Sequence, residues 1–149
     1  MIDTVVVGLG NLLLKDDGAG VHAIRALEKE ALPPSVELVD GGTSTLSLLS
    51  YFVGCPKIII IDALQAGLPP GTIYRLRPED IPRYRSEHLS IHDVQILDVI
   101  KMAAMLGEQP EVVILGIEPQ EIASGLELTP VIEERIPSLV QSVIKELCA

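Results

Sequence analysis

The chain has 149 residues, of which 48% are hydrophobic, and its net charge at neutral pH is −10. This length fits one domain with a substantial core, which we place over residues 1–149. The acidic balance argues against a nucleic-acid partner, because binding phosphates requires clustered basic residues. The one basic group is too small to change this conclusion, and it consists of Arg75, Arg77, Arg83 and Arg85. No apolar run reaches the length of a membrane span and no signal-peptide pattern opens the chain, so we expect a cytoplasmic protein without membrane insertion.

Strand-like and helix-like patterns alternate through the first half of the chain. Runs of β-branched residues predict buried strands, and apolar residues at intervals of three and four predict helices. The expected elements are a strand over 2–7, a helix over 17–31, a strand over 36–39, a short helix over 44–51 and a strand over 57–62.

The second half opens with an alternating segment, 72–77, whose arginines fall on one side. This pattern is typical of an edge strand with one wet face, and we expect it to run antiparallel to the others. A polar connection, a helix, a buried strand and a last helix should follow, over 77–90, 91–106, 111–117 and from 130 onwards. The last helix has Thr129 as its N-cap and Pro130 at its first position. Pro137 inside it is expected to kink or break it.

Alternating strands and helices predict an α/β fold, a three-layer α/β/α sandwich around a five-stranded, mostly parallel twisted sheet. Right-handed crossovers and one reversal of direction give the strand order 2-1-3-5-4, with the fourth strand antiparallel. In this order the winding direction changes between the first and third strands, where open α/β sheets bind ligands. The candidate site therefore lies at the carboxyl ends of these two strands.

Three side chains are expected at this crevice. Asp17 follows the first strand, Asp62 ends a run of four isoleucines, and His92 lies at the start of a later helix. Taken singly, Asp17 is also explained as a first-turn acid and His92 as a histidine bonded to backbone. Asp62 is harder to explain in this way, because a carboxylate directly after a buried strand is costly unless something satisfies it. Two carboxylates and an imidazole suit zinc, nickel, manganese or iron, so we predict a metal site.

Other polar residues near the crevice have two explanations each. Asp16 is interpreted as the cap of the first helix, and Asp40, Gly41 and Gly42 as a turn after the second strand. Asp98 is most simply a solvated helix residue. The alternative for all five is a place behind the metal ligands or in a loop that contacts the substrate.

The remaining imidazoles are weaker candidates for the site. His88, in the polar connection, ranks after His92 as a ligand. His22, within the first helix, is expected on the surface or in packing.

Few known sequence motifs are present. Gly8-Leu9-Gly10-Asn11 suggests a dinucleotide loop, but position 13 is Leu where G-x-G-x-x-G needs its third glycine. Acids also follow where a pyrophosphate needs open amides. No G-x-S-x-G, H-E-x-x-H or P-loop sequence occurs. The loop sequence Leu12-Leu13-Leu14 either packs beneath the sheet edge or offers an apolar surface to a partner.

Six segments, in their order and spacing, resemble one protein family, the maturation endopeptidases of nickel–iron hydrogenases. They are GLGNLLLKDDGAGVHAI, VELVDGGT, IIIIDALQAGLPPGTIYRL, SIHDVQILDVI, ILGIEPQ and GLELTPVIEE. The resemblance implies a compact α/β protein that removes the C-terminal extension of the hydrogenase large-subunit precursor after nickel insertion. It also implies that Asp17, Asp62 and His92 contact nickel carried by the precursor, a site that other divalent metals can occupy. The first of these is often Glu in the family, and Asp17 is one methylene shorter.

The resemblance therefore predicts a metal-dependent endopeptidase, a hydrolase in which Asp17, Asp62 and His92 hold the precursor's nickel and align the adjacent peptide bond. Cleavage then uses a metal-polarised carbonyl, or a water activated by the metal or by a carboxylate. The alternative function is a non-catalytic nickel-binding checkpoint or chaperone for the same precursor. A third interpretation, a Rossmann-like nucleotide binder, is disfavoured.

Overall fold

The computed structural model describes residues 1–84 and 91–148, with the backbone alone at residues 83, 84 and 91–94. Its α-helices, strands and 3-10 helices (η) follow in chain order: β1 (Thr4–Leu9), η1 (Lys15–Gly18), α1 (Ala19–Leu27), β2 (Val36–Gly42), η2 (Thr45–Leu48), α2 (Leu49–Phe52), β3 (Lys57–Ala63), β4 (Ile73–Leu76), η3 (Pro78–Asp80), α3 (Ile81–Tyr84), α4 (Ile91–Met105), β5 (Glu111–Ile117) and α5 (Pro130–Leu147). Within these ranges no helix combines the length and the apolar character that crossing a bilayer requires.

The five strands form one sheet in the order β2-β1-β3-β5-β4. Neighbouring strands are parallel except at the edge, where β4 pairs antiparallel with β5. The predicted α/β fold, strand order and reversed fourth strand are thus confirmed.

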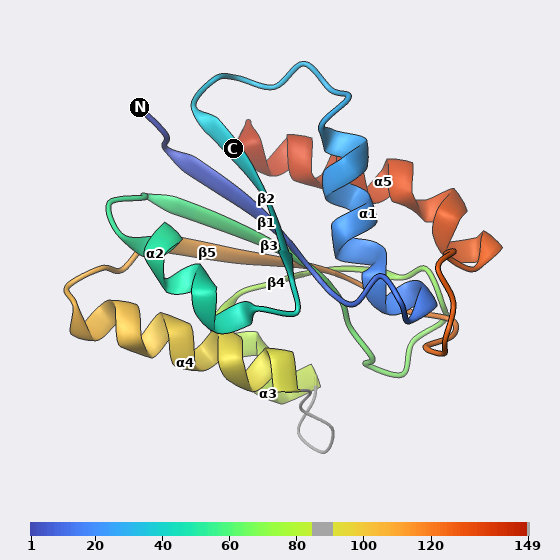
Figure 1. Ribbon diagram of the computed structural model, residues 1–149. Helices are drawn as coiled ribbons and strands as arrows, with labels where there is room; N and C mark the ends of the chain where they lie inside the picture. The colour runs from blue at the N-terminus through green and yellow to red at the C-terminus, as the bar shows by residue number, and fades with distance from the viewer. Residues whose placement is uncertain (85–90, 149) are drawn as a thin grey trace.

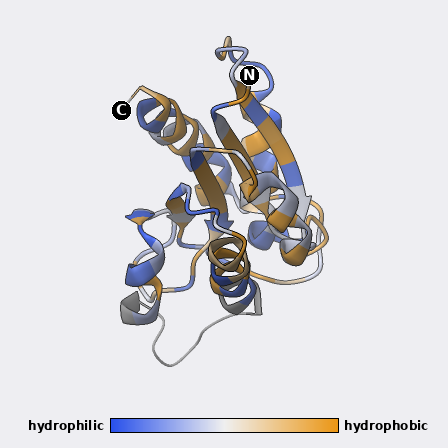
Figure 2. Cartoon of the chain, turned by 90° about the vertical axis from the view of Figure 1, so that its left-hand side faces the viewer, coloured by the Kyte–Doolittle hydropathy of each residue, from blue (hydrophilic) through white to orange (hydrophobic). Residues whose placement is uncertain are grey.

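Helices cover both faces of the sheet, α1 and α5 on one face and α2, α3 and α4 on the other (Figure 1). Successive strand residues point to opposite faces, so each strand supplies both cores. In β3, Ile59 and Ile61 pack with α1 and α5, whereas Ile58 and Ile60 pack with the opposite helices. Figure 2 shows the hydrophobic strands running between the helical layers. Burial on both faces explains why this strand is a continuous run of isoleucine.

Two glycines bring α1 unusually close to the sheet. A Cβ atom on Gly20 would lie 2.3 Å from the carbonyl oxygen of Ile61 and 2.4 Å from that of Leu9. A Cβ atom on Gly8 would lie 2.3 Å from the carbonyl oxygen of Gly20. No side chain fits at such distances, so both positions require glycine. As a result, the start of α1 sits over the carboxyl ends of β1 and β3, and η1 contacts β3.

Several expected boundaries differ from the structure, and the first strand, expected over 2–7, is β1 over Thr4–Leu9. The helix expected over 17–31 is a 3-10 turn followed by α1, which ends at Leu27. β2 continues past Val39 to Gly42, because β1 keeps pairing with it beyond a register shift. The connection expected to be irregular over 77–90 contains η3 and α3, since Pro78 begins a helical turn and Ile81 is buried in the core.

Pro137 is expected to kink or break the last helix, and the break does not occur, because α5 is helical from Pro130 to Leu147. Pro137 is exposed, so water can reach the Glu133 carbonyl group that loses its amide donor. A proline inside a helix costs about 3 kcal/mol. Each buried aliphatic side chain on the inner face stabilises the fold by about 1.5–3 kcal/mol. The buried residues of this face are Ile132, Ile136, Leu139, Val140 and Val143. Packing therefore outweighs the lost hydrogen bond.

Candidate functional site

The loop between β1 and η1 is shaped around Asp17. Its Oδ2 accepts a hydrogen bond from the Asn11 amide at 2.9 Å. Gly10 has a φ of 135°, and a Cβ atom there would lie 1.9 Å from the Asp17 carbonyl oxygen. One carboxylate oxygen of Asp17 therefore fixes the turn, whereas Oδ1 makes no hydrogen bond within the described part of the chain.

The same turn is poorly suited to a phosphate. Its amides already have partners, since the Asn11 amide donates to Asp17 and the Gly10 amide donates to the Gly42 carbonyl oxygen at 2.8 Å. A dinucleotide loop needs such amides open toward its ligand. Both glycines of the Gly-x-Gly sequence instead allow close approach of backbone, Gly8 to Gly20 and Gly10 to Asp17.

Asp62 lies near the end of β3 and is 6% exposed. Its Oδ1 accepts a hydrogen bond from the amide of Ala63 at 2.9 Å. The preceding residue, Ile61, lies beneath Gly20 at the start of α1, and η1 contacts β3. Asp62 and Asp17 therefore belong to adjoining segments at the carboxyl edge of the sheet.

His92 is the second residue of α4, which begins on the side where the parallel strands end and runs back along the sheet (Figure 1). Its side chain lies outside the described residues, as does the whole of His88. The shared site of Asp17, Asp62 and His92 therefore stays a prediction. Among the side chains that are described, no group of three or more His, Cys, Asp or Glu is placed to hold a metal ion.

Asp16 is fully buried and accepts four hydrogen bonds from the connection between β5 and α5. Its Oδ2 accepts from the amides of Gln120 and Glu121, both at 3.0 Å, and from the hydroxyl group of Thr129 at 2.7 Å. Its Oδ1 accepts from the Thr129 amide at 2.8 Å. Charge-assisted bonds of this number satisfy a buried carboxylate.

The interpretation of Asp16 as a helix cap is therefore wrong. No side-chain bond caps either η1 or α1, because the 3-10 turn directs this carboxylate toward loop amides distant in sequence. Thr129 does occupy the N-cap position of α5, but its hydroxyl group donates to Asp16 and does not accept from its own helix.

Asp40, Gly41 and Gly42 are expected as a turn after the second strand, but they are the last residues of β2, at the point where its pairing with β1 shifts register. Asp40 Oδ1 accepts a hydrogen bond from the Gly42 amide at 3.0 Å, and Gly42 has a φ of 50°. A Cβ atom on Gly41 would lie 2.8 Å from Cδ2 of Leu9. Asp98 is exposed on α4, as expected for a solvated residue. A part for any of these residues in substrate binding stays a prediction.

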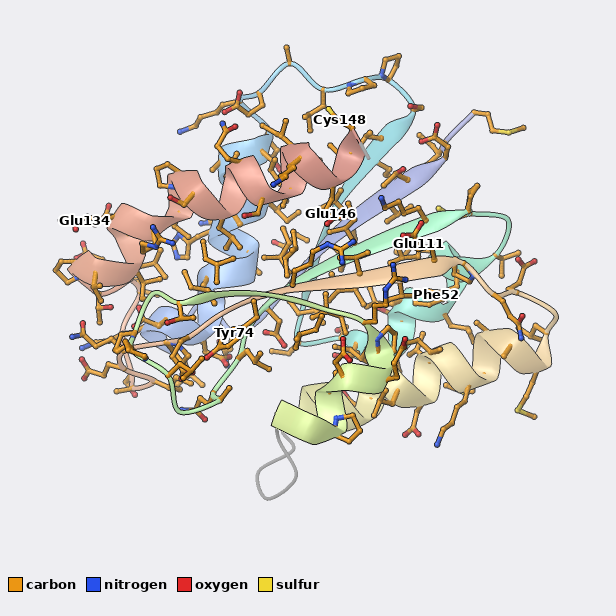
Figure 3. The ribbon with its side chains drawn as sticks, turned by 180° about the vertical axis from the view of Figure 1, so that it is seen from behind. Phe52, Tyr74, Glu111, Glu134, Glu146 and Cys148 are labelled. Atoms are coloured by element: carbon orange, nitrogen blue, oxygen red, sulfur yellow. The ribbon has the colours of Figure 1, made fainter. Side chains whose placement is uncertain are left out.

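Glu118 is a buried acid that the sequence analysis did not select. Its Oε1 accepts hydrogen bonds from the amides of Ala66 and Leu68 at 2.9 and 3.2 Å, and from the hydroxyl group of Tyr74 at 2.7 Å. Tyr74 is labelled in Figure 3. These bonds fix the loop that follows Asp62. The sequence does indicate Glu118 as a candidate, because this acid comes directly after a buried strand, just as Asp62 comes directly after four isoleucines.

His22 is half-buried, in agreement with the packing role expected for it. Its Nε2 atom is buried and has no hydrogen-bond partner within the residues described. Burial and the charge of Arg25 lower the pKa of His22, against an opposing effect of Glu133. These effects favour the neutral form of the imidazole over the charged form.

Comparison with known proteins connects this geometry to one family. Residues 21–146 match a family model described as hydrogenase maturation protease. The hydrogenase 2 maturation protease of Escherichia coli K12 is 34% identical over 146 residues, which are 96% of this chain and 89% of that protein. The hydrogenase expression/formation protein HupD of Thiocapsa roseopersicina is 34% identical over 149 residues, which are 97% of this chain and 67% of that protein.

Solved structures share the fold over nearly the whole chain. The hydrogenase maturating endopeptidase HybD from E. coli superposes with a TM-score of 0.89 at 33% identity, covering 99% of this chain and 92% of that one. The NiFe hydrogenase maturation protease HybD from Thermococcus kodakarensis gives a TM-score of 0.81 at 29% identity, covering 97% and 98%. The resemblance noted in the sequence is confirmed. The chain is an endopeptidase that belongs to the hydrogenase maturation protease family.

Proposed function

We propose that this protein removes the C-terminal extension from the precursor of a nickel–iron hydrogenase large subunit, after nickel has been inserted. The observation that carries the proposal is the Asp17 turn. It holds one carboxylate oxygen through the Asn11 amide and leaves Oδ1 without a partner among the described residues, next to the segment that carries Asp62.

The donor set suits nickel as part of the substrate. Carboxylate oxygens of Asp17 and Asp62 and a ring nitrogen of His92 are ligands that a borderline divalent ion accepts. Three ligands leave further coordination positions for groups of the precursor and for water. Because the ion enters with the precursor, the protein completes its site only when the precursor docks.

The chain's own residues position the precursor and, where water attacks, also transfer a proton. Asp17, Asp62 and His92 fix the nickel-bearing end of the precursor, so that the adjacent peptide bond lies in a reactive position. The ion supplies Lewis acidity, either to the peptide carbonyl group or to an attacking water. In the second case a carboxylate oxygen of Asp17 or Asp62 that does not hold the ion takes a proton from the attacking water and passes it to the peptide nitrogen as the C–N bond breaks.

The test compares nickel-loaded with nickel-free precursor. Each form is mixed with the purified protein, and loss of the C-terminal peptide is followed by mass spectrometry. We expect only the nickel-loaded form to be shortened. Cleavage of both forms at equal rates would contradict recognition through nickel, and binding of the loaded form without cleavage would favour the checkpoint or chaperone function.

A further inference from the structure

Two loops distant in sequence pair directly beside Asp17. Leu14 and Gly125 form a parallel bridge, in which the Gly125 amide donates to the Leu13 carbonyl oxygen at 2.9 Å. The amide of Lys15 donates to the Gly125 carbonyl oxygen at 3.0 Å. The loop before η1 and the loop between β5 and α5 therefore form one surface (Figure 1).

Lys15 is held in an unfavourable backbone conformation within this surface. Its φ is 47°, the one positive φ at a non-glycine residue in the described ranges. Its Nζ atom lies 3.1 Å from Oε2 of Glu121, and its aliphatic stem crosses Gly125, where a Cβ atom would lie 3.0 Å from Cε of Lys15. Strain of this kind persists only where surrounding contacts enforce it, and such positions concentrate at functional sites.

Apolar side chains are exposed on the paired loops. Leu13 is 63% exposed, Leu126 is 70% exposed and Ile122 is 38% exposed. Leu13 and Leu126 flank the Leu14–Gly125 bridge, so they lie on neighbouring segments. Leu13 therefore does not pack beneath the sheet edge, and grouped exposed apolar residues mark interaction sites.

An acidic hollow adjoins these side chains. A cavity of ≈ 570 Å³ lies between Lys15 and the start of α5, and its charged lining residues are Lys15, Glu121 and Glu127. Since the charges of Lys15 and Glu121 offset each other, the carboxylate of Glu127 gives the lining a net negative charge. Glu127 also lines a smaller hollow of ≈ 280 Å³ together with Glu133. The region thus presents acidic groups beside exposed leucines.

We propose that Leu13, Ile122, Leu126 and Glu127 form a docking surface for a segment of the hydrogenase precursor that carries Lys or Arg beside apolar side chains. The proposal rests on the proposed function. Two features select this occupant. The surface is continuous with the Asp17 loop, through the bonds that Asp16 accepts from the connection between β5 and α5. Among the described residues, the unpaired charge of the surface is negative. The segment's apolar side chains cover the leucines, and its cation lies against Glu127.

The apolar part is tested by a double variant, Leu13→Ser with Leu126→Ser. Its cleavage of nickel-loaded precursor is compared with that of Leu106→Ser, which alters a leucine of equal exposure, 64%, beyond the end of α4. We expect KM to rise about tenfold or more in the double variant, with kcat unchanged, because hot-spot side chains are lost from binding alone. Leu106→Ser should keep the parent KM.

The charged part is tested by Glu127→Lys against Glu30→Lys, an equal charge change at an exposed residue beyond the end of α1. Glu127→Lys should raise KM and reduce its dependence on salt, whereas Glu30→Lys should do neither. Equal effects of the two charge variants, or an unchanged KM in the leucine variant, would overturn the docking surface while the parent protein still cleaves. If the parent neither binds nor cleaves the precursor, the proposed function fails, and the docking surface fails with it.

Discussion

Two adjacent aspartates at the start of the first helical segment perform different tasks because their carboxylates meet different loops. Asp16 is buried and accepts four hydrogen bonds from the connection before α5. Asp17 is half-buried and, from the residues that the structure describes, accepts one bond, from the Asn11 amide. Asp16 therefore fixes the position of the turn, and Asp17 is the one of the two with an oxygen left to contact a substrate.

Replacing Asp16 by Ala should destabilise the protein strongly. Three loop amides and a hydroxyl group would lose their buried acceptor, a loss of about 3 kcal/mol or more in the free energy of unfolding. Urea denaturation measures this change, and Asp98→Ala, which alters an exposed residue of α4, serves as the control. A change in Asp16→Ala within about 0.5 kcal/mol, the range typical of surface substitutions, would show that Asp16 does not hold the two loops together.

At the scale of elements, the end of α5 is tied to the edge of the sheet by Glu146. The carboxylate is buried, pairs with Arg75 of β4, and lies 3.6 Å from Nζ of Lys57 of β3. Figure 3 shows Glu146 between α5 and the sheet. Arg75 is therefore occupied by an acid of its own chain. The expectation that the chain binds no nucleic acid stays a prediction, since Arg85 and the side chain of Arg83 lie outside the described residues.

The stability of this contact should depend on pH. The hydrogen bond from Arg75 and the charges of Arg75 and Lys57 lower the pKa of Glu146, against the opposing effect of burial. A carboxyl group whose pKa is lowered in the folded protein stabilises the fold at pH values above its ordinary pKa, about 4.5. That stabilisation is lost as the pH falls through the lowered pKa.

Glu146→Gln should therefore lower the free energy of unfolding at neutral pH. It should also make that free energy fall less steeply as the pH is lowered below about 4.5. Urea denaturation from pH 7 to pH 3 measures both effects. An unchanged slope in Glu146→Gln would show that this carboxyl group does not contribute to acid sensitivity. Glu134→Gln, an exposed change on the same helix, provides the control.

Elements with strong local patterns could be predicted from the sequence, and contacts between distant residues could not. The isoleucine run gave β3 to within one residue, and Glu111–Ile117 was predicted with its observed bounds. The partners of Asp16 lie more than a hundred positions away, so nothing near Asp16 indicates them. Helix propensity alone predicts a kink or a break at Pro137, but it does not tell whether the proline faces water. Glu118 carried the same signal as Asp62 and could have been selected.

At the scale of the whole molecule, loops from four strands are tied into one edge. The Gly10 amide donates to the carbonyl oxygen of Gly42 at the end of β2, and the Leu64 amide donates to that of Ile117 of β5 at 2.9 Å. Asp16 and Glu118 add bonds across the loops on either side. A site assembled from parallel strands in this way needs no single sequence motif, since the topology brings its parts together. The prediction that Asp17 and Asp62 converge at this edge follows from the strand order. In the structure, the close packing of Gly8 and Gly20 brings the start of α1 onto the sheet and η1 against β3.

The most direct test of the proposed site is the rate at which Asp17→Ala cleaves nickel-loaded precursor. We expect a rate at least about 100-fold below that of the parent protein, as for the loss of a group that acts at the reacting atoms, with an unchanged circular dichroism spectrum. His92→Ala should behave in the same way, and Asp3→Ala, an exposed change near the start of β1, should retain the parent rate. Cleavage by Asp17→Ala or His92→Ala at close to the parent rate would contradict a site in which Asp17, Asp62 and His92 share the precursor's nickel.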